Sequence, residues 1–252
     1  RLSPSAEIRC IKLKGRFMIS VCIATYNGER FIHRQIETIL PQLSADDEII
    51  VSDDGSSDAT IQVVEAFQSP QIKIVHNQGR HGYTANYEHA LSYAKGDIII
   101  FADQDDEWEP NKVKRCLEEL ETCDFIVSDA SLIDTDGQIT DDSFYRLREP
   151  KRTFAGNILK FGYLGCCIAF RRNVLDKVLP FPKNHVMCSH DNWITLVAMA
   201  YYRYRVLDDR LVRYRRHGKN VSNIDKIGTH TTLFFKIKYR VYILLNLIGR
   251  LF

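Results

Sequence analysis

The chain has 252 residues, of which 45% are hydrophobic and 26% charged, and its formal net charge is +2 at pH 7. This length is enough for one large domain with an ample core, and the proportions are those of an ordinary globular protein. We therefore expect neither a disordered chain nor a strongly basic binder of nucleic acid.

The seven cysteines include no Cys-x-x-Cys pair, so a zinc site is not indicated and reduced thiols in a cytoplasmic protein are expected. No apolar stretch reaches the length of a membrane span. Residues 1–17 are basic and unpatterned, and we expect a leader or a vector-derived segment there, with a short ordered arm as the alternative. The globular domain is expected at residues 18–228 and a separate C-terminal helix at 229–252.

Four short apolar runs in the first half of the chain predict strands, and each is followed by a segment with helical spacing of apolar residues. The strands are expected at residues 19–24, 48–52, 72–76 and 98–102, and the helices at 31–40, 61–67, 83–94 and 113–120. Because strands and helices alternate at short spacing, we expect a parallel sheet with helices on both faces.

Polar residues follow three of these strands, at the sheet edge where open α/β folds hold their ligands. Asp103, Asp105 and Asp106 follow the fourth strand, and carboxylates this close repel one another unless a cation lies among them. Oxygen ligands favour Mg²⁺ or Mn²⁺, which could hold a diphosphate in a chain that has no glycine-rich phosphate loop. The alternative is a solvated acidic turn that caps the next helix.

The ordered motifs resemble those of the nucleotide-sugar domain of family 2 glycosyltransferases. They are residues 25–29 (TYNGE), 53–58 (DDGSSD) and 102–106 (ADQDD), with Asn77, Gly82 and Asn86 in the positions of the family's Asn…Gly…Asn stretch. The wording of residues 101–106, with Trp108 soon after, looks like the rhamnosyltransferase branch. The resemblance covers about residues 18–225 and implies an α/β GT-A nucleotide-diphospho-sugar transferase fold with a mostly parallel central sheet flanked by helices.

The resemblance also implies roles for individual side chains. It assigns Asp53 to the nucleotide base, Asp103 to the ribose and Asp105 to the metal, with Asp106 near the sugar or the metal. The full set expected to bind the nucleotide sugar is Thr25, Tyr26, Asn27, Glu29, Asp53, Asp54, Gly82, Asn86, Asp103 and Asp106. A packing aromatic is the alternative for Tyr26, and an acid favoured at a helix N-terminus is the alternative for Glu29.

The second half of the chain is less regular. It predicts a strand at residues 125–128, a turn at 134–137, a mobile loop at 141–153 near the acceptor, and a strand-forming apolar stretch that ends at Phe170. Strand-like residues are also expected at 210–214. The neighbouring Cys166 and Cys167 are expected to be small packing residues.

Asp191 begins an apolar helix that we expect to end at Tyr201. A carboxylate in this place can simply cap the helix. The family pattern instead implies a catalytic Asp191, which would take the proton from the acceptor hydroxyl as it attacks the anomeric carbon. A metal ion at Asp105 would then stabilise the departing diphosphate.

His217 resembles the histidine that completes the metal site in this family, with a structural or surface histidine as the alternative. Several nearby arginines alternate with apolar residues. They are Arg203, Arg205, Arg210, Arg213, Arg215 and Arg216. These arginines form either the solvent face of strands or an edge that binds phosphate of the donor or of a lipid-phosphate acceptor.

The tail from residue 233 onward is apolar and basic, with Lys236, Lys238 and Arg240 in its first half. This pattern favours an amphipathic helix at a membrane surface over a spanning helix. Packing of the helix on the domain or in a homodimer is the alternative.

We expect a metal-dependent inverting glycosyltransferase in cell-surface polysaccharide biosynthesis, cytoplasmic or peripheral at the inner face of the cell membrane. It would move one sugar, with rhamnose suggested by the motif wording, from a nucleotide-diphosphate donor to a glycan or lipid-linked acceptor. The alternatives are a sugar-nucleotide-binding module without transferase activity and a nucleotidyltransferase.

Overall fold

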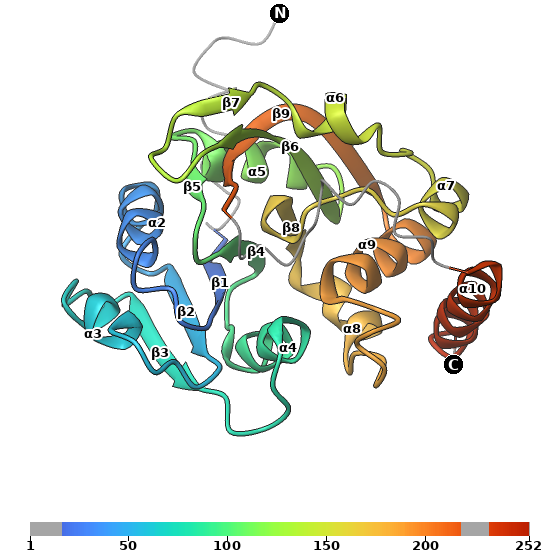
Figure 1. Cartoon of the computed structure of the whole chain (residues 1–252), viewed down its shortest axis with the longest axis horizontal. Helices are drawn as coiled ribbons and strands as arrows, with labels where there is room; N and C mark the ends of the chain where they lie inside the picture. The colour runs from blue at the N-terminus through green and yellow to red at the C-terminus, as the bar shows by residue number, and fades with distance from the viewer. Residues whose placement is uncertain (1–16, 218–231, 252) are drawn as a thin grey trace, which may run out of the picture.

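The computed structural model of the chain describes residues 17–217 and 232–251 (Figure 1). The expected leader lies outside the described residues except for its last residue, Phe17. Residues 218–228 of the expected domain and 229–231 of the expected tail also lie outside them.

In the described part of the chain, one nine-stranded sheet has the order β3-β2-β1-β4-β8-β6-β9-β5, and β7 pairs with β6. Its first half is parallel and consists of β1 (Ile19–Thr25), β2 (Glu48–Asp53), β3 (Ile72–His76) and β4 (Ile98–Asp103). The predicted strands in this half are confirmed to within a residue. Since all of them run the same way, their carboxyl ends meet at one edge of the sheet.

The second half of the sheet mixes directions. It consists of β5 (Glu107–Trp108), β6 (Phe125–Ile133), β7 (Ile139–Asp141), β8 (Ile168–Arg171) and β9 (Tyr204–Arg215). Strand β8 runs antiparallel between β4 and β6, whereas β6 and β9 are parallel. The sheet is thus mostly parallel, with β8 as an antiparallel insertion.

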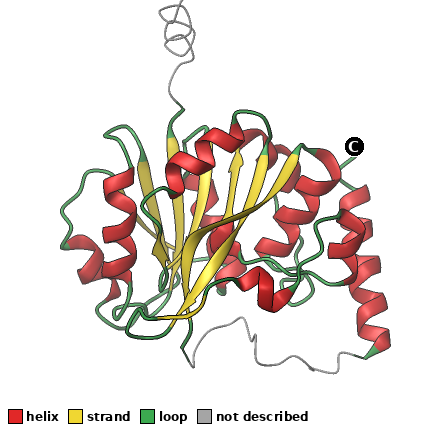
Figure 2. Cartoon of the chain, turned by 90° about the horizontal axis from the view of Figure 1, so that it is seen from above, coloured by secondary structure: helices red, strands yellow, loops and turns green. Residues whose placement is uncertain are grey.

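Helices cover both faces of the sheet (Figure 2). They are α2 (Ile32–Ile39), α3 (Thr60–Glu65), α4 (Tyr83–Tyr93), α5 (Lys112–Leu120), α6 (Phe144–Arg148), α7 (Phe154–Leu159), α8 (Leu175–Val178), α9 (His190–Tyr201) and α10 (Leu233–Ile248), with short 3₁₀ turns η1 (Leu40–Gln42), η2 (Gly165–Cys167) and η3 (Arg172–Val174). Strand β4 is covered on both sides, and its side chains from Ile98 to Ala102 are 0% exposed. Each large apolar side chain buried in this way contributes roughly 1.5–3 kcal/mol.

Two predictions for the second half need correction. The strands predicted at 125–128 and 210–214 are the ends of longer strands, β6 and β9. The loop predicted at 141–153 contains α6, whose N-cap Ser143 donates its hydroxyl to Asp129 Oδ2 at 2.5 Å. Asp129 also accepts a hydrogen bond from Tyr145 N at 2.9 Å, so a buried carboxylate on β6 holds this segment in place.

Helix α10 lies beside α8 and α9 (Figure 1). Its Ile243 and Leu247 are buried, and Tyr201 Oη on α9 donates to Leu247 O at 2.5 Å. One side of the helix therefore packs on the domain, as one of the alternatives proposed. Among the described helices, none combines the length and the apolar character needed to cross a membrane.

Candidate active site

The loops after β1 and β2 are joined by hydrogen bonds between their own polar groups. Asn27 Oδ1 accepts from Ser57 N at 2.8 Å, and Asn27 N donates to Ser56 Oγ at 2.9 Å. Asn27 has a φ of 48°, a left-handed conformation that asparagine tolerates well. Glu29 Oε2 accepts from Ala59 N at 2.8 Å. Both side chains therefore brace the two loops against each other.

The neighbouring acids Asp53 and Asp54 organise two further turns. Buried Asp53 accepts from Ser56 Oγ at 2.5 Å and from Gly55 N at 3.2 Å. Asp54 Oδ2 accepts from Gly82 N at 2.7 Å, where the glycine has a φ of 103° that other residues rarely adopt. Asp54 thereby connects the end of β2 to the turn that precedes α4.

Asn86 on α4 is buried and fixes the backbone beneath these loops. Its Nδ2 donates to Ser52 O at 2.7 Å and to Thr25 O at 3.2 Å. Tyr26 is held through its backbone: its N donates to Gln104 Oε1 at 2.9 Å, and its carbonyl accepts from Gln104 Nε2 at 3.1 Å. The residue itself is 57% exposed. Thr25, Tyr26 and Asn86 therefore lie at the same sheet edge, and Gln104 is a positioning residue that the sequence did not single out.

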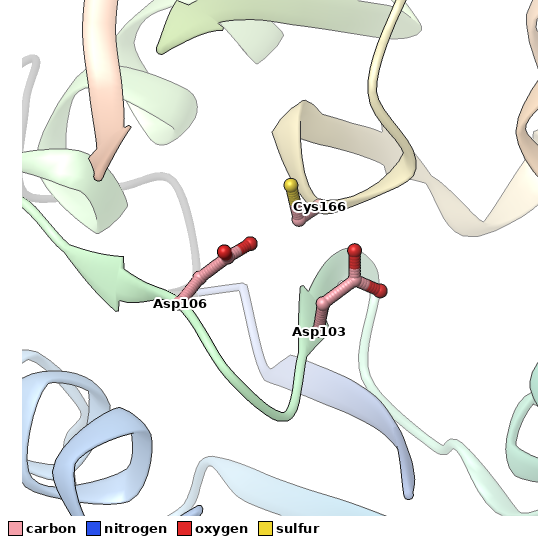
Figure 3. Close-up of side chains that lie close together, drawn as sticks. All are labelled: Asp103, Asp106 and Cys166. Atoms are coloured by element: carbon pink, nitrogen blue, oxygen red, sulfur yellow. The ribbon is translucent and has the colours of Figure 1, made fainter. Parts of the chain in front are cut away.

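A different arrangement follows β4, where acids gather with a thiol. Single ligand atoms from Asp103, Asp106 and Cys166 all lie within 4.8 Å of one another. Figure 3 shows these side chains facing a common space, with Asp103 at the end of β4, Asp106 directly before β5 and Cys166 from η2. The Tyr87 hydroxyl, on helix α4, donates to Asp103 Oδ1 at 2.7 Å and fixes the orientation of that carboxylate.

Burial and mutual repulsion make this cluster unfavourable when it is fully ionised. Burial raises the pKa of Asp103 to about 7, with further contributions from the charges of Asp105 and Asp191. Burial and the same Asp105 charge raise the pKa of Asp106 well above its usual value. Asp106 Oδ1 accepts from Arg215 N at 2.8 Å, but its Oδ2 is buried without a hydrogen-bond partner among the described residues. A cation would satisfy this oxygen and reduce the repulsion.

The predicted metal pair lies next to this cluster. His217 Nε2 is 2.6 Å from Asp105 Oδ2, and the imidazole stacks on Phe31 with ring centroids 5.4 Å apart. Arg215 Nε donates to the Asp105 carbonyl at 2.9 Å and so fixes the backbone of the loop. Because the two residues are 112 positions apart, their contact is made by β9, which brings His217 back to the end of β4.

Carboxylate oxygens and an imidazole are ligand types that a divalent cation accepts, but the group of three ligand atoms that lie together among the described residues is that of Asp103, Asp106 and Cys166, and Asp105 and His217 are not part of it. Such an ion commonly takes one or two carboxylates from the protein and keeps its other positions for phosphate or water. A hydrogen bond with Cys167, followed by burial, raises the pKa of the Cys166 thiol well above its usual value. The thiol therefore stays neutral at ordinary pH and is a poor ligand for Mg²⁺ or Mn²⁺.

Asp191 lies in the first turn of α9, on the same side as these acids. Its Oδ1 accepts from the Ser189 hydroxyl and from Asn192 N, the latter at 2.8 Å. Its charge contributes to the raised pKa of Asp103 and of Tyr83. A Cβ atom added at Gly165, beside Cys166, would lie 3.4 Å from Asp191 Cβ, so η2 and the start of α9 are in close contact.

His190, the residue before Asp191, packs into the interior beneath the site. It is buried, and its ring stacks on Tyr87 with centroids 4.1 Å apart. A Cβ atom at Gly165 would come within 2.6 Å of His190 Nε2, so only glycine allows this approach. Burial lowers the pKa of His190 to about 4, and the ring is neutral at ordinary pH.

The arginines of β9, and Arg203 just before it, are ordered mainly by acids of this chain. Arg203, Arg205 and Arg213 form ion pairs with acids at 3.2, 2.6 and 2.7 Å. Arg215 is buried, and its Nη2 lies 2.6 Å from Glu107 Oε1. Alternation with apolar residues predicted part of this strand, residues 210–214, but it could not identify Arg215 as the residue that braces Asp105 and Asp106.

Comparison with known proteins identifies the family. Residues 20–179 match the model of glycosyl transferase family 2, which is more than half of the chain. The chain belongs to this family. The matched range of the family 2 glycosyltransferase includes all the loops after β1, β2 and β4, whereas Asp191 and His217 follow it in sequence.

Two curated relatives of this family 2 glycosyltransferase illustrate the range of similarity. An uncharacterised glycosyltransferase of Nostoc sp. is 30% identical over 80% of this chain and 66% of its own length. The UDP-Glc:alpha-D-GlcNAc-diphosphoundecaprenol beta-1,3-glucosyltransferase WfgD of Escherichia coli is 37% identical over 39% of each chain. The chain thus spans less than two thirds of these relatives.

Solved structures confirm the predicted GT-A fold. S. aureus TarS 1-349, in complex with UDP-GlcNAc, superposes with a TM-score of 0.68 at 21% identity, over 91% of this chain and 67% of that one. The mannosyltransferase PcManGT of Pyrobaculum calidifontis, in complex with GDP-Man and Mn²⁺, has a TM-score of 0.62 at 22% identity, over 97% and 70% of the two chains.

Proposed function

We propose that this family 2 glycosyltransferase is metal-dependent and inverting, and that it moves one sugar from a nucleotide-diphosphate donor to a glycan or lipid-linked acceptor in cell-surface polysaccharide biosynthesis. The observation that carries this proposal is the gathering of Asp103, Asp106 and the Asp105–His217 pair at the end of β4, with Asp191 beside them. The named substrate of the E. coli relative, a lipid diphosphate sugar, supports this acceptor class.

Asp105 and His217 would hold Mn²⁺ or Mg²⁺, with the unpartnered Oδ2 of Asp106 as a further oxygen ligand. When bound, the ion would offset the negative charge that develops on the leaving diphosphate. The Mn²⁺ in the Pyrobaculum mannosyltransferase structure supports this choice of metal. The two cations have the same preference for oxygen ligands, so the residues do not favour one over the other.

Asp191 is proposed as the general base. It would take the proton of the acceptor hydroxyl while that oxygen bonds to the anomeric carbon and the bond from this carbon to the diphosphate oxygen breaks. Attack from the face opposite the leaving group inverts the anomeric centre. The N-terminus of α9 favours a negative charge at this position, and the bonds from Ser189 and Asn192 N fix the orientation of the carboxylate.

The loops after β1, β2 and β3 would form the nucleotide pocket. Asp53 and Asp103 are proposed near the base and the ribose, and exposed Tyr26 at the rim of the pocket. The mutual hydrogen bonds of Asn27, Glu29 and Asp54 support a preformed shape, which reduces the entropy lost on binding.

A thermal-shift panel tests the donor proposal. It would compare UDP, GDP and dTDP and their sugars, including dTDP-rhamnose, with and without Mn²⁺. We expect one base to stabilise the protein only with the metal, by about 2.7 kcal/mol at a concentration a hundred times the Kd. A flat panel would overturn the proposal. Donor binding without any transfer would favour a binding module, and pyrophosphate release from a nucleoside triphosphate and a sugar 1-phosphate would favour a nucleotidyltransferase.

A further inference from the structure

A second, basic pocket lies beyond the proposed active site. It has a volume of about 520 Å³, and its walls come from three separate segments of the chain. The polar lining residues are Arg80 and His81 after β3, Lys183, Asn184 and His185 before α9, and Tyr242 on α10. None of the described residues that line it is acidic, although Asp54 and Glu88 face His81 and His185 from outside the lining. The positive charge that favours an anion therefore comes from Arg80 and Lys183.

Arg80 of this pocket is held in position by the opposite wall. Arg80 Nη1 donates to Lys183 O at 2.7 Å and lies 3.0 Å from His185 Nε2. Neither contact involves the other guanidinium nitrogens, and Lys183 is an exposed side chain. A guanidinium fixed in this way keeps its other nitrogens for the oxygens of a phosphate group, and the exposed Lys183 on the same wall adds a second positive charge.

The walls of the pocket are connected to two segments of the proposed active site, the loop after β2 and the start of α9. His81 Nδ1 lies 3.0 Å from Asp54 Oδ1, so one wall is tied to the loop that follows β2. The opposite wall, residues 183–186, leads directly into α9 and Asp191. The pocket wall and Asp191 therefore belong to consecutive segments of the chain.

Helix α10 extends the pocket into an apolar surface. The Tyr242 hydroxyl accepts from Asn184 N at 2.9 Å, which joins the helix to the pocket wall. Leu245 follows Tyr242 by three residues, so both lie on the same side of the helix, and Leu245 is 64% exposed. Val241 and Ile248 continue this exposed apolar stripe, and Val186 at the pocket is 88% exposed.

We propose that this pocket binds the phosphate or diphosphate group of an amphiphilic acceptor whose hydrocarbon chain lies along the stripe of Val241, Leu245 and Ile248. A phosphate group alone would leave the stripe uncovered, and an uncharged lipid would leave Arg80 and Lys183 without an anion. The inference rests on the proposed transferase function and narrows the acceptor to a phosphate-bearing lipid.

Calorimetric titration of the full chain in EDTA tests this inference, because EDTA removes the metal that the donor diphosphate needs. The probes are dodecyl phosphate, inorganic phosphate and uncharged dodecyl maltoside, all below their micellar concentrations. We expect dodecyl phosphate to bind at least tenfold more tightly than either of the other two. Arg80→Ala with Lys183→Ala should weaken this binding at least tenfold, and Leu245→Ser should weaken it without affecting inorganic phosphate.

Lys236→Ala, which removes an exposed cation of α10 outside the pocket, is the matched control and should bind dodecyl phosphate like the unaltered chain. The single variant Lys183→Glu guards against misfolding, because it changes an exposed side chain, and it should also lose binding. Unchanged binding in the Arg80/Lys183 variant would overturn the inference, as would equal affinity for inorganic and dodecyl phosphate. The Mn²⁺-dependent shift with donor should persist in every variant, and its absence from the unaltered chain would instead overturn the proposed function.

Discussion

The loops after β1 and β2 and the acids after β4 lie at one edge of the same sheet, but their polar groups are used differently. In the first region, Asn27, Asp54 and Asn86 form hydrogen bonds with neighbouring loops and backbone. In the second region, the Asp106 Oδ2 atom is buried without a described partner, and burial raises the pKa of Asp103 to about 7.

This difference indicates a structural role for the first region and a role in binding and catalysis for the second. The Asn27, Asp54 and Asn86 side chains already have hydrogen-bond partners without a ligand, whereas the buried Oγ1 of Thr25 has none among the described residues. These three side chains therefore define the outline of a pocket and stabilise the fold. The second region is costly when it is ionised and gains from a cation. Substitutions in the first region should therefore mainly lower stability, whereas those in the second should mainly change binding and turnover.

Asp191→Asn should give the largest effect on turnover. The amide cannot accept the proton of the acceptor, so we expect transfer to fall by about 10²–10⁴-fold, while metal-dependent donor binding is kept. Initial rates and donor thermal shifts on the same preparation measure both quantities. Turnover like that of the unaltered chain would remove Asp191 from the mechanism.

The buried His190 should make the free energy of unfolding depend on pH. Its pKa is about 4 in the folded chain and about 6.5 when unfolded. The unfolded state therefore binds more protons between these values, and the free energy of unfolding should fall as the pH drops from 6.5 to 4, by about 3 kcal/mol in total. Urea titrations across this window should show a shallower decline for His190→Asn. An equally steep decline in the variant would assign the effect to other groups.

Asn86→Ala tests the structural role of the first region. The change leaves Thr25 O and Ser52 O without the donor that they share, and we expect the free energy of unfolding to fall by about 2–3 kcal/mol. Gln78→Ala, at an exposed position of the loop after β3, is the control and should change stability little. A variant with full stability but no donor binding would show that Asn86 contacts the ligand instead.

Asp106→Asn should give the smallest effect and the opposite sign. The pKa values of Asp103 and Asp106 are raised in the folded chain, so stability is lost as the pH rises from about 4 through about 7. Removing one charge should raise the free energy of unfolding at pH 8 by about 1 kcal/mol in EDTA, and should reduce the stabilisation by Mn²⁺. Exposed Asp46→Asn is the control. A metal-free variant that is less stable at pH 8 would contradict the account.

The sequence predicted the parallel half of the sheet well because each of its strands is marked by a pattern within its own segment. The uninterrupted apolar run of β4 and the polar residues after it identify a buried strand that ends in acids. The antiparallel insertion of β8 between β4 and β6 depends on pairing between distant segments, which no local pattern specifies. Strand β9 likewise begins at Tyr204, before the predicted strand at 210–214, because its first residues pair with the distant strand β6.

The candidate site was predictable in part for the same reason. Motifs indicated that acids follow β4, but not that Asp54 and Asn86 would form hydrogen bonds with neighbouring backbone. Cys166 and Tyr87 come from other elements, and only the fold brings them to Asp103. Packing of η2 against α9 through Gly165 is a matter of space that no motif encodes.

The most direct test of the central claim measures how much Mn²⁺ strengthens binding of the nucleoside diphosphate that the panel selects. Calorimetric titrations with Mn²⁺ and with EDTA would compare the unaltered chain, Asp105→Asn and the control Asp46→Asn, which makes the same substitution at an exposed position before β2. We predict that Mn²⁺ increases affinity at least tenfold, about 1.4 kcal/mol, in the unaltered chain and the control but not in Asp105→Asn. An equal increase in Asp105→Asn would contradict the account.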